Sequence, residues 1–218
     1  MDENFLIRAE PEDVAPELAL VGCALITGYG AAAFSAKTQP GDTVAIIGAG
    51  GVGLAAVLGA KRAGAARIIV IDVDDRKLEF SRVFGATDTI NSRNVDPIAR
   101  VRELVGTLGC AGADVVIDCV GVTATIAQAI ASGRDGRLGA NTGAAIVLAG
   151  LGDGEIQINS AELIFAQKRI IGTFAGDMRH AEIAEILSDI RSGDLDVSRL
   201  VTDSFAFDEL EELSLIHI

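Results

Sequence analysis

Three glycines that follow a short apolar run have the spacing of a phosphate-binding loop. Gly48, Gly50 and Gly53 come directly after residues 43–47 in the pattern G-x-G-x-x-G, and an apolar helical segment follows them. The first glycine permits a tight turn, the second lets a pyrophosphate approach the backbone, and the third lets the helix pack close to the sheet. The N–H groups and the positive dipole end of that helix would face the phosphates, so the loop predicts an anion site for a dinucleotide.

An acidic residue follows this loop at the distance that ribose binding needs. A second apolar run, residues 67–71, leads to Asp72, which stands nineteen positions after Gly53. A carboxylate about 20 residues after such a loop can accept hydrogen bonds from the ribose hydroxyls of an adenosine. The glycine spacing alone also fits a strand-to-helix turn that binds nothing, because the chain has 25 glycines. The complete order of strand, loop, helix and strand favours cofactor binding.

Apolar runs and helical segments alternate along most of the chain. The strands are continuously apolar, which indicates a parallel sheet covered by helices on both faces. The predicted fold class is therefore α/β, a doubly wound, six-stranded Rossmann sheet with strand order 3-2-1-4-5-6, whose ligands bind at the carboxyl ends of the strands. The expected strands are residues 43–47, 67–72, 87–91, 114–119, 144–149 and 169–173. The expected helices are 24–34, 52–63, 74–84, 97–105, 123–131 and 180–191, with a short helix from Pro16 and a further strand and helix start within residues 196–213.

Charge and composition exclude several classes of protein. The formal net charge is −13 and the 18 lysines and arginines are scattered, so we expect no nucleic-acid partner. The apolar runs end well before the ~18 residues that a membrane span needs, and the acidic start has no basic region before an apolar segment. We therefore expect a soluble, cytoplasmic protein without a membrane partner.

The three cysteines give no metal or disulfide pattern of their own. Cys23, Cys110 and Cys119 have neither CxxC spacing nor the density of a disulfide scaffold. On residue type alone, Cys110 and Cys119 are most simply small, partly buried residues.

Several ordered motifs together resemble one enzyme family. The segments VGCALITGYGA, QPGDTVAIIGAGGVGL and AGAARIIVIDVDDRK, within a match over residues 12–207, resemble the zinc-dependent medium-chain alcohol dehydrogenases. The resemblance implies an NAD-binding domain that is inserted into a catalytic domain. It also implies oxidation of a small alcohol at a catalytic zinc, with hydride transfer to the nicotinamide, and a homodimer formed through sheet edges.

The resemblance assigns roles to individual residues. Cys23 matches a catalytic zinc ligand, Asp72 and Lys77 match the pair that holds the adenosine ribose, and Phe174 matches a nicotinamide-side position more loosely. Thr27 and Val52 match positions that press on the nicotinamide ring. With the glycine loop, the candidate cofactor-binding residues are Thr27, Gly48, Gly50, Gly51, Val52, Gly53, Asp72, Lys77, Val120, Ala149, Gly150 and Leu151.

The chain also departs from the family pattern. The family places a catalytic domain of about 150 residues, with the other zinc ligands, before this point, and only His180 and His217 are available as histidines here. We expect residues 1–23 to be a linker or edge of the catalytic domain, 24–174 the Rossmann domain, and 175–218 a C-terminal remnant of the second lobe. The chain is then an NAD-binding domain lacking its N-terminal catalytic domain, which would bind zinc only with that domain supplied.

Two functions of different classes stay open on these residues. The first is the NAD(H)-binding domain of an NAD-dependent alcohol or aldehyde dehydrogenase, inactive as an isolated chain. The second is a non-catalytic NAD(H)-binding or dimerisation module. A methyltransferase would also use a glycine loop and a ribose-binding acid, but it does not predict Cys23. Asp114 and Asp118 flank an expected strand and are expected to be loop contacts rather than catalytic acids, and His180 is expected at a solvated helix start.

Overall fold

The computed structural model describes residues 16–106, 111–139, 142–203 and 206–209. Its strands are β1 (Thr43–Ile47), β2 (Arg67–Asp72), β3 (Asp88–Asn91), β4 (Val115–Asp118), β5 (Ala145–Leu148) and β6 (Arg169–Gly172). Its helices are η2 (Pro16–Gly22), α1 (Ala24–Gly30), the π-helical η3 (Ala31–Ser35), α2 (Gly51–Arg62), α3 (Asp75–Phe84), α4 (Pro97–Val105), α5 (Thr123–Ser132), α6 (Ser160–Ala166), η4 (Ala175–Asp177), α7 (His180–Ser192), η5 (Ser198–Leu200) and η6 (Phe207–Glu209). Cys110 and His217 lie outside the described residues.

The six strands form one parallel sheet in the predicted order, β3-β2-β1-β4-β5-β6. In the middle of the sheet, Ile46 of β1 stands opposite Val70 of β2 and Ile117 of β4. These β-branched side chains fit a pleated surface that is covered on both faces. The predicted fold class and topology are confirmed, and because all five pairings are parallel, the carboxyl strand ends lie along the same edge of the sheet.

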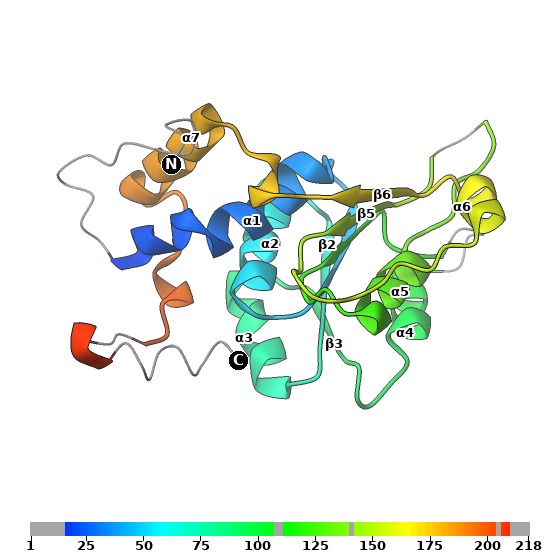
Figure 1. Cartoon of the computed structure of the whole chain (residues 1–218), viewed down its shortest axis with the longest axis horizontal. Helices are drawn as coiled ribbons and strands as arrows, with labels where there is room; N and C mark the ends of the chain where they lie inside the picture. The colour runs from blue at the N-terminus through cyan, green and yellow to red at the C-terminus, as the bar shows by residue number, and fades with distance from the viewer. Residues whose placement is uncertain (1–15, 107–110, 140–141, 204–205, 210–218) are drawn as a thin grey trace.

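Two apolar clusters, one on each face, hold the sheet between layers of helices. Val44 and Ile46 of β1 pack with α1, α2, α3 and α7, while Ala45 and Ile47 pack with α4 and α5. Figure 1 shows α2 and α3 on one side of the strands and α4 and α5 on the other. Burying each such large apolar side chain stabilises the fold by roughly 1.5–3 kcal/mol. The central strands are therefore a rigid base for the loops at their ends.

The C-terminal part packs onto the same core as the N-terminal helices. Ile183, Ile186 and Leu187 of α7 belong to the cluster that contains Leu25 and Tyr29 of α1. The helix expected at residues 180–191 is confirmed, with an exposed His180 at its first position. The further strand expected within residues 196–213 is wrong for the described part of this tail, because residues 196–203 and 206–209 form only η5 and η6.

Two other elements differ from expectation. The single helix expected at residues 24–34 is α1 followed by the π-helical η3, and the short helix α6 had no predicted counterpart. Among the described residues, no single helix has the length and apolar character to cross a membrane. One bent pair, Pro16–Gly22 with Ala24–Ser35 at 59°, meets that criterion together by length and composition only.

Candidate functional site

The glycine loop folds tightly between β1 and α2. Gly48 has φ +95°, a conformation that L side chains rarely adopt, and its N–H donates to the Ile71 carbonyl at 2.8 Å. A Cβ on Gly53 would lie only 1.8 Å from the Gly48 carbonyl oxygen. The turn and the close helix packing that the motif predicts are therefore both present.

Gly50 occupies the open side of this loop. A Cβ built on Gly50 would meet no protein atom within 4 Å, and the residue is exposed. The Leu54 N–H donates to the Gly50 carbonyl at 2.9 Å, so the N–H groups of Gly51, Val52 and Gly53 have no acceptor within the helix. The backbone here presents unpaired donors and a dipole to an open space, which is the arrangement that binds phosphates.

The Asp72 carboxylate lies beside the loop at the end of β2. Its Oδ2 accepts from the Ala49 N–H at 2.7 Å, and its Oδ1 accepts from Val73 and Asp74 N–H groups at 2.7 and 3.0 Å. A carboxylate has about four acceptor positions, so three such bonds leave one for a ribose hydroxyl. The same bonds fix the side chain against the glycine loop and orient it before any ligand arrives.

The start of α3 carries further charges next to Asp72. Asp74 caps this helix, and a hydrogen bond from the Arg76 side chain lowers the pKa of its carboxyl to about 2. The Arg76 guanidinium is 3.0 Å from that carboxylate and forms an ion pair with it. Lys77 is exposed one position further on. The candidate ribose pair therefore stands in a predominantly acidic loop.

A buried carboxylate organises the ends of β4 and β5. Asp118 is fully buried, and its side chain accepts from the N–H groups of Val120 and Gly121 at 3.2 and 3.1 Å. Its backbone carbonyl accepts from Ala149 at 2.9 Å and Gly150 at 2.8 Å. Burial raises the pKa of this carboxyl, although the N–H donors and Thr125 oppose the shift. The expectation of a loop contact is confirmed for Asp118, and sequence reasoning missed how much of the site it orders.

Asp114, at the other end of β4, is likewise a structural acid. It accepts from the Thr43 N–H at 2.8 Å and pairs with Arg134 at 2.5 Å. Cys119 is partly buried, as expected, and burial raises the pKa of its thiol. Burial of this kind disfavours the thiolate, which is the nucleophilic form of cysteine.

Three apolar side chains are exposed beyond the carboxyl strand ends. Val120 follows β4, Leu151 follows β5, and Phe174 follows β6, with exposed fractions of 39%, 101% and 81%. Together with the loop and Asp72, they place the candidate residues from five strands along one edge of the sheet. Exposed apolar surface beside a polar cradle is typical of a binding site.

Helix α1 lies against the glycine loop and carries two further candidates. A Cβ on Gly28 would lie 1.9 Å from the Val52 carbonyl oxygen. A Cβ on Gly51 would lie 3.6 Å from the Cβ of Ala24. Thr27 is half-buried on this helix, and Cys23 is exposed at its N-terminal end. Sequence reasoning missed Gly28, although it stands in a run of small residues that indicates close helix packing.

Zinc does not fit the described residues. A protein zinc site needs three or four His, Cys, Asp or Glu ligands, and no group of three such side chains occurs in the described part of the chain. Cys23, for which the sequence resemblance implies a zinc-ligand role, is an exposed thiol that belongs to no group of three possible ligands among the described residues.

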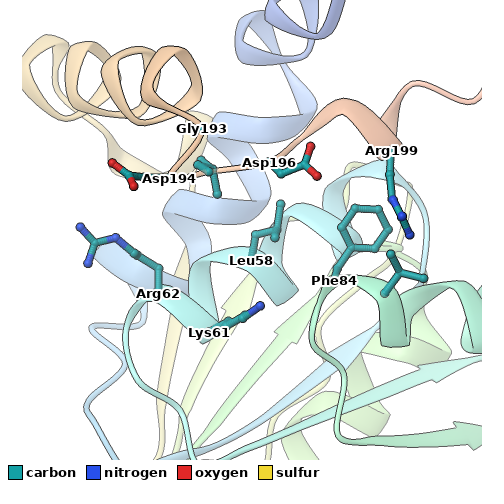
Figure 2. A pocket seen from close by; sticks show the side chains of 10 residues that line it. Leu58, Lys61, Arg62, Phe84, Gly193, Asp194, Asp196 and Arg199 are labelled. Carbon is teal, nitrogen blue, oxygen red and sulfur yellow. The ribbon is translucent and has the colours of Figure 1, made fainter.

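A cavity of about 660 Å³ lies on the other side of the molecule. Lys61 and Arg62 at the end of α2, Phe84 at the end of α3, residues 193–196 and Arg199 are among the residues that line it (Figure 2). Since α2 leads away from the carboxyl end of β1, this cavity lies at the opposite edge of the sheet from the glycine loop. The C-terminal ends of α2, α3 and α7 contribute residues to this lining. With Asp194 and Asp196 also present, the cavity favours neither sign of ligand charge.

Comparison with protein families gives a match over most of the strands and helices that form the candidate site. Residues 51–192 match the model of the zinc-binding dehydrogenases. The chain belongs to this family. The match begins within the glycine loop and includes Asp72 and every strand from β2 to β6, so the family and the site geometry rest on the same residues.

Known relatives extend the similarity to nearly the whole chain. It is 32% identical over 217 residues to S-(hydroxymethyl)glutathione dehydrogenases of Escherichia coli, with 99% of this chain covered and 57% of theirs. Benzyl alcohol dehydrogenase from Acinetobacter calcoaceticus superimposes with a TM-score of 0.85 at 28% identity, over 98% of this chain and 56% of that one. The chain thus spans a little over half the length of these relatives.

One similar structure holds a nucleotide. A protein of Sinorhizobium meliloti 1021, described as a zinc-binding dehydrogenase and bound to NADP, has a TM-score of 0.68 at 27% identity, over 82% of this chain and 50% of its own. The relatives are dehydrogenases, which favours an enzyme domain over a non-catalytic binding module. Because this neighbour binds NADP, membership of the family does not decide between NAD and NADP. The residues around Asp72 are the ones that bear on this choice.

Proposed function

We propose that this chain binds NAD(H) along the carboxyl edge of its sheet, as the cofactor half of an alcohol dehydrogenase. The observation that carries the proposal is the glycine loop, whose open Gly50 and unpaired N–H groups stand beside a preoriented Asp72. The pyrophosphate would lie on the loop, the adenosine ribose at Asp72, and the nicotinamide toward Val120, Ala149, Gly150 and Thr27. The bound nicotinamide would accept a hydride from an alcohol or return it to an aldehyde.

The cofactor should be NAD rather than NADP. The Asp72 carboxylate stands where a 2′-phosphate would lie, and Asp74 holds the only arginine at the start of α3. Placing like charges together costs several kcal/mol, so NADH should bind at least about 100-fold tighter than NADPH. Calorimetric titration of both cofactors measures this difference.

The Asp72→Ala variant tests the same assignment. Removing the carboxylate should narrow the difference in binding affinity between NADH and NADPH. Asp75→Ala is the matched control, because Asp75 is an exposed acid of the same helix start that bonds Asn91 instead of the loop. Tighter binding of NADPH by the unchanged protein would refute the NAD assignment.

The chain by itself should bind cofactor without turning over alcohol. The described residues offer Cys23 but no group of three zinc ligands, and a catalytic zinc normally has three protein ligands. Purified protein should hold less than one equivalent of zinc by elemental analysis. It should also reduce no NAD with primary or secondary alcohols. Stoichiometric zinc together with turnover would show that side chains of the tail, His180 among them, supply ligands.

We also propose that two copies of the chain associate through the free edge of β6. In the described sheet β6 pairs only with β5, and the neighbouring Ile164 and Phe165 of α6 are 70% and 83% exposed. Unpaired edge strands beside exposed apolar side chains favour pairing with a second chain. Sedimentation equilibrium should give a dimer, and Phe165→Glu should shift it to monomer. Val95→Glu, at the β3 edge, should leave the mass unchanged, and a monomeric unchanged protein would contradict the proposal.

A further inference from the structure

A hydrogen-bonded cluster ties the end of β6 to the first helices of the chain. The Ser35 hydroxyl donates to Asp177 Oδ2 at 2.6 Å, and the Ser35 and Thr173 hydroxyl oxygens are 2.7 Å apart. Because the single Ser35 proton goes to the carboxylate, Thr173 is the donor of the second bond. Ser35 is only 8% exposed. We call Ser35, Thr173 and Asp177 the Ser35 cluster.

The turn that carries Asp177 has an unfavourable backbone. Ala175, Gly176 and Asp177 have φ of +50°, +69° and +54°, so three consecutive residues are left-handed and two of them are not glycine. Such conformations persist only where surrounding contacts enforce them, and they concentrate at functional sites. The bond from Ser35 is one of the contacts that hold this turn.

Backbone packing against α1 is the other contact that holds it. A Cβ on Gly176 would lie 2.2 Å from the Ile26 carbonyl oxygen, and a Cβ on Gly30 would lie 2.5 Å from the Gly176 carbonyl oxygen. The turn therefore touches α1 on both sides of Thr27 in the sequence. Fixing the turn also fixes the helix on which Thr27 stands.

The cluster stands at one end of the proposed cofactor site. Thr173 continues the sheet, since its N–H donates to the Leu148 carbonyl at 3.2 Å, and it directly precedes Phe174. In the strand order, β6 is separated from β2, which carries Asp72, by β1, β4 and β5. The adenosine end and the Ser35 cluster therefore lie at different ends of the same edge.

We propose that Ser35 and Asp177 are positioning residues for the nicotinamide half of the cofactor. They hold α1, with Thr27, against the end of β6, with Phe174, so that both sides of the nicotinamide pocket keep a fixed separation. This inference rests on the proposed function, because it needs a nicotinamide between these two elements. The residues would act through Thr27 and Phe174 and would not touch the reacting atoms.

The two halves of the cofactor can be measured separately on the full chain. NADH binding is followed by the fluorescence of its nicotinamide, and ADP-ribose, which lacks that ring, is titrated by calorimetry. Ser35→Ala should weaken NADH binding about tenfold, the size expected for loss of a hydrogen bond to a charged group, and leave ADP-ribose unchanged. Asp177→Asn keeps an acceptor and tolerates a left-handed backbone, so it should stay within about twofold of the unchanged protein.

Ser81→Ala is the matched control. Ser81 is fully buried and its hydroxyl donates to the Leu78 carbonyl within α3, away from the glycine loop and α1, so loss of this hydroxyl should change neither affinity. Equal weakening of NADH and ADP-ribose by Ser35→Ala would overturn the inference, as would no weakening of either. Equal affinity of the unchanged protein for both ligands would also overturn it, because no nicotinamide site would then exist to be positioned. Failure of the unchanged protein to bind either ligand would instead refute the proposed function.

Discussion

Gly50→Val should abolish NAD(H) binding while the protein stays folded. The backbone of Gly50 has φ −81° and ψ −170°, which valine adopts readily, and a Cβ there meets no protein atom within 4 Å. The added methyl groups would therefore occupy only the space in front of the α2 N–H groups. A pyrophosphate must enter that space to reach the backbone, so the cost falls on the ligand and not on the fold.

The measurement pairs binding with stability. Calorimetry with NADH should give no detectable heat of binding, and thermal unfolding followed by circular dichroism should match the unchanged protein within a few degrees. Gly22→Val is the control, because Gly22 also has open space around a Cβ but lies outside the loop. Retained NADH affinity in the Gly50 variant would place the cofactor away from this loop.

The strands and their order could be predicted from the sequence because each strand is a short, continuously apolar run. Residues 43–47 and 67–72 match β1 and β2 without error, β3 and β6 differ from expectation by one residue at one end, and β4 and β5 by one residue at each end. Buried parallel strands give this strong local signal, and the βα alternation then leaves few possible topologies.

The missed helix α6 has no comparable local signal. It is seven residues long, and Ile164 and Phe165 are largely exposed, so its apolar residues do not mark a buried face. Its start depends on the Asn159 side chain, which accepts from the Ala161 and Glu162 N–H groups. The strand expected within residues 196–213 is wrong for a different reason. Val197 is buried there, but it packs in the apolar cluster of the helical layer and pairs with no strand.

Residues of the candidate site are predictable from the sequence where they are close together in it, and not where they meet only in the fold. Gly48, Gly50 and Asp72 are predictable because one βαβ unit contains them all. The contacts of Asp118 and of the Ser35 cluster are not predictable in this way, since they join backbone groups of different strands or side chains 138 and 142 positions apart. A single sequence carries no periodicity or spacing that reports such pairs.

Gly28→Ala should destabilise the protein, although alanine favours helices. In an exposed helix this change would gain about 1 kcal/mol from helix propensity. Here the new Cβ would lie 1.9 Å from the Val52 carbonyl oxygen and 2.8 Å from both the Ala56 nitrogen and the Ala55 Cβ. Two of these atoms belong to the α2 backbone, so relief requires moving α1 away from α2. Overpacking of this kind typically costs about 1–3 kcal/mol and occasionally more, so it should exceed the gain in propensity.

Thermal unfolding of two variants decides between these opposing effects. We expect Gly28→Ala to lose about 2 kcal/mol net, which lowers Tm by roughly 4–8 °C in a chain of this size. Gly51→Ala is the matched change at the same contact between α1 and α2, but its Cβ would lie 3.6 Å from Ala24, at ordinary contact distance, so its Tm should stay unchanged or rise. A higher Tm for Gly28→Ala would mean that propensity outweighs packing and that α1 does not lie this close to the glycine loop. Since α1 carries Thr27 and Cys23, the same result would remove the structural reason for placing these residues at the cofactor site.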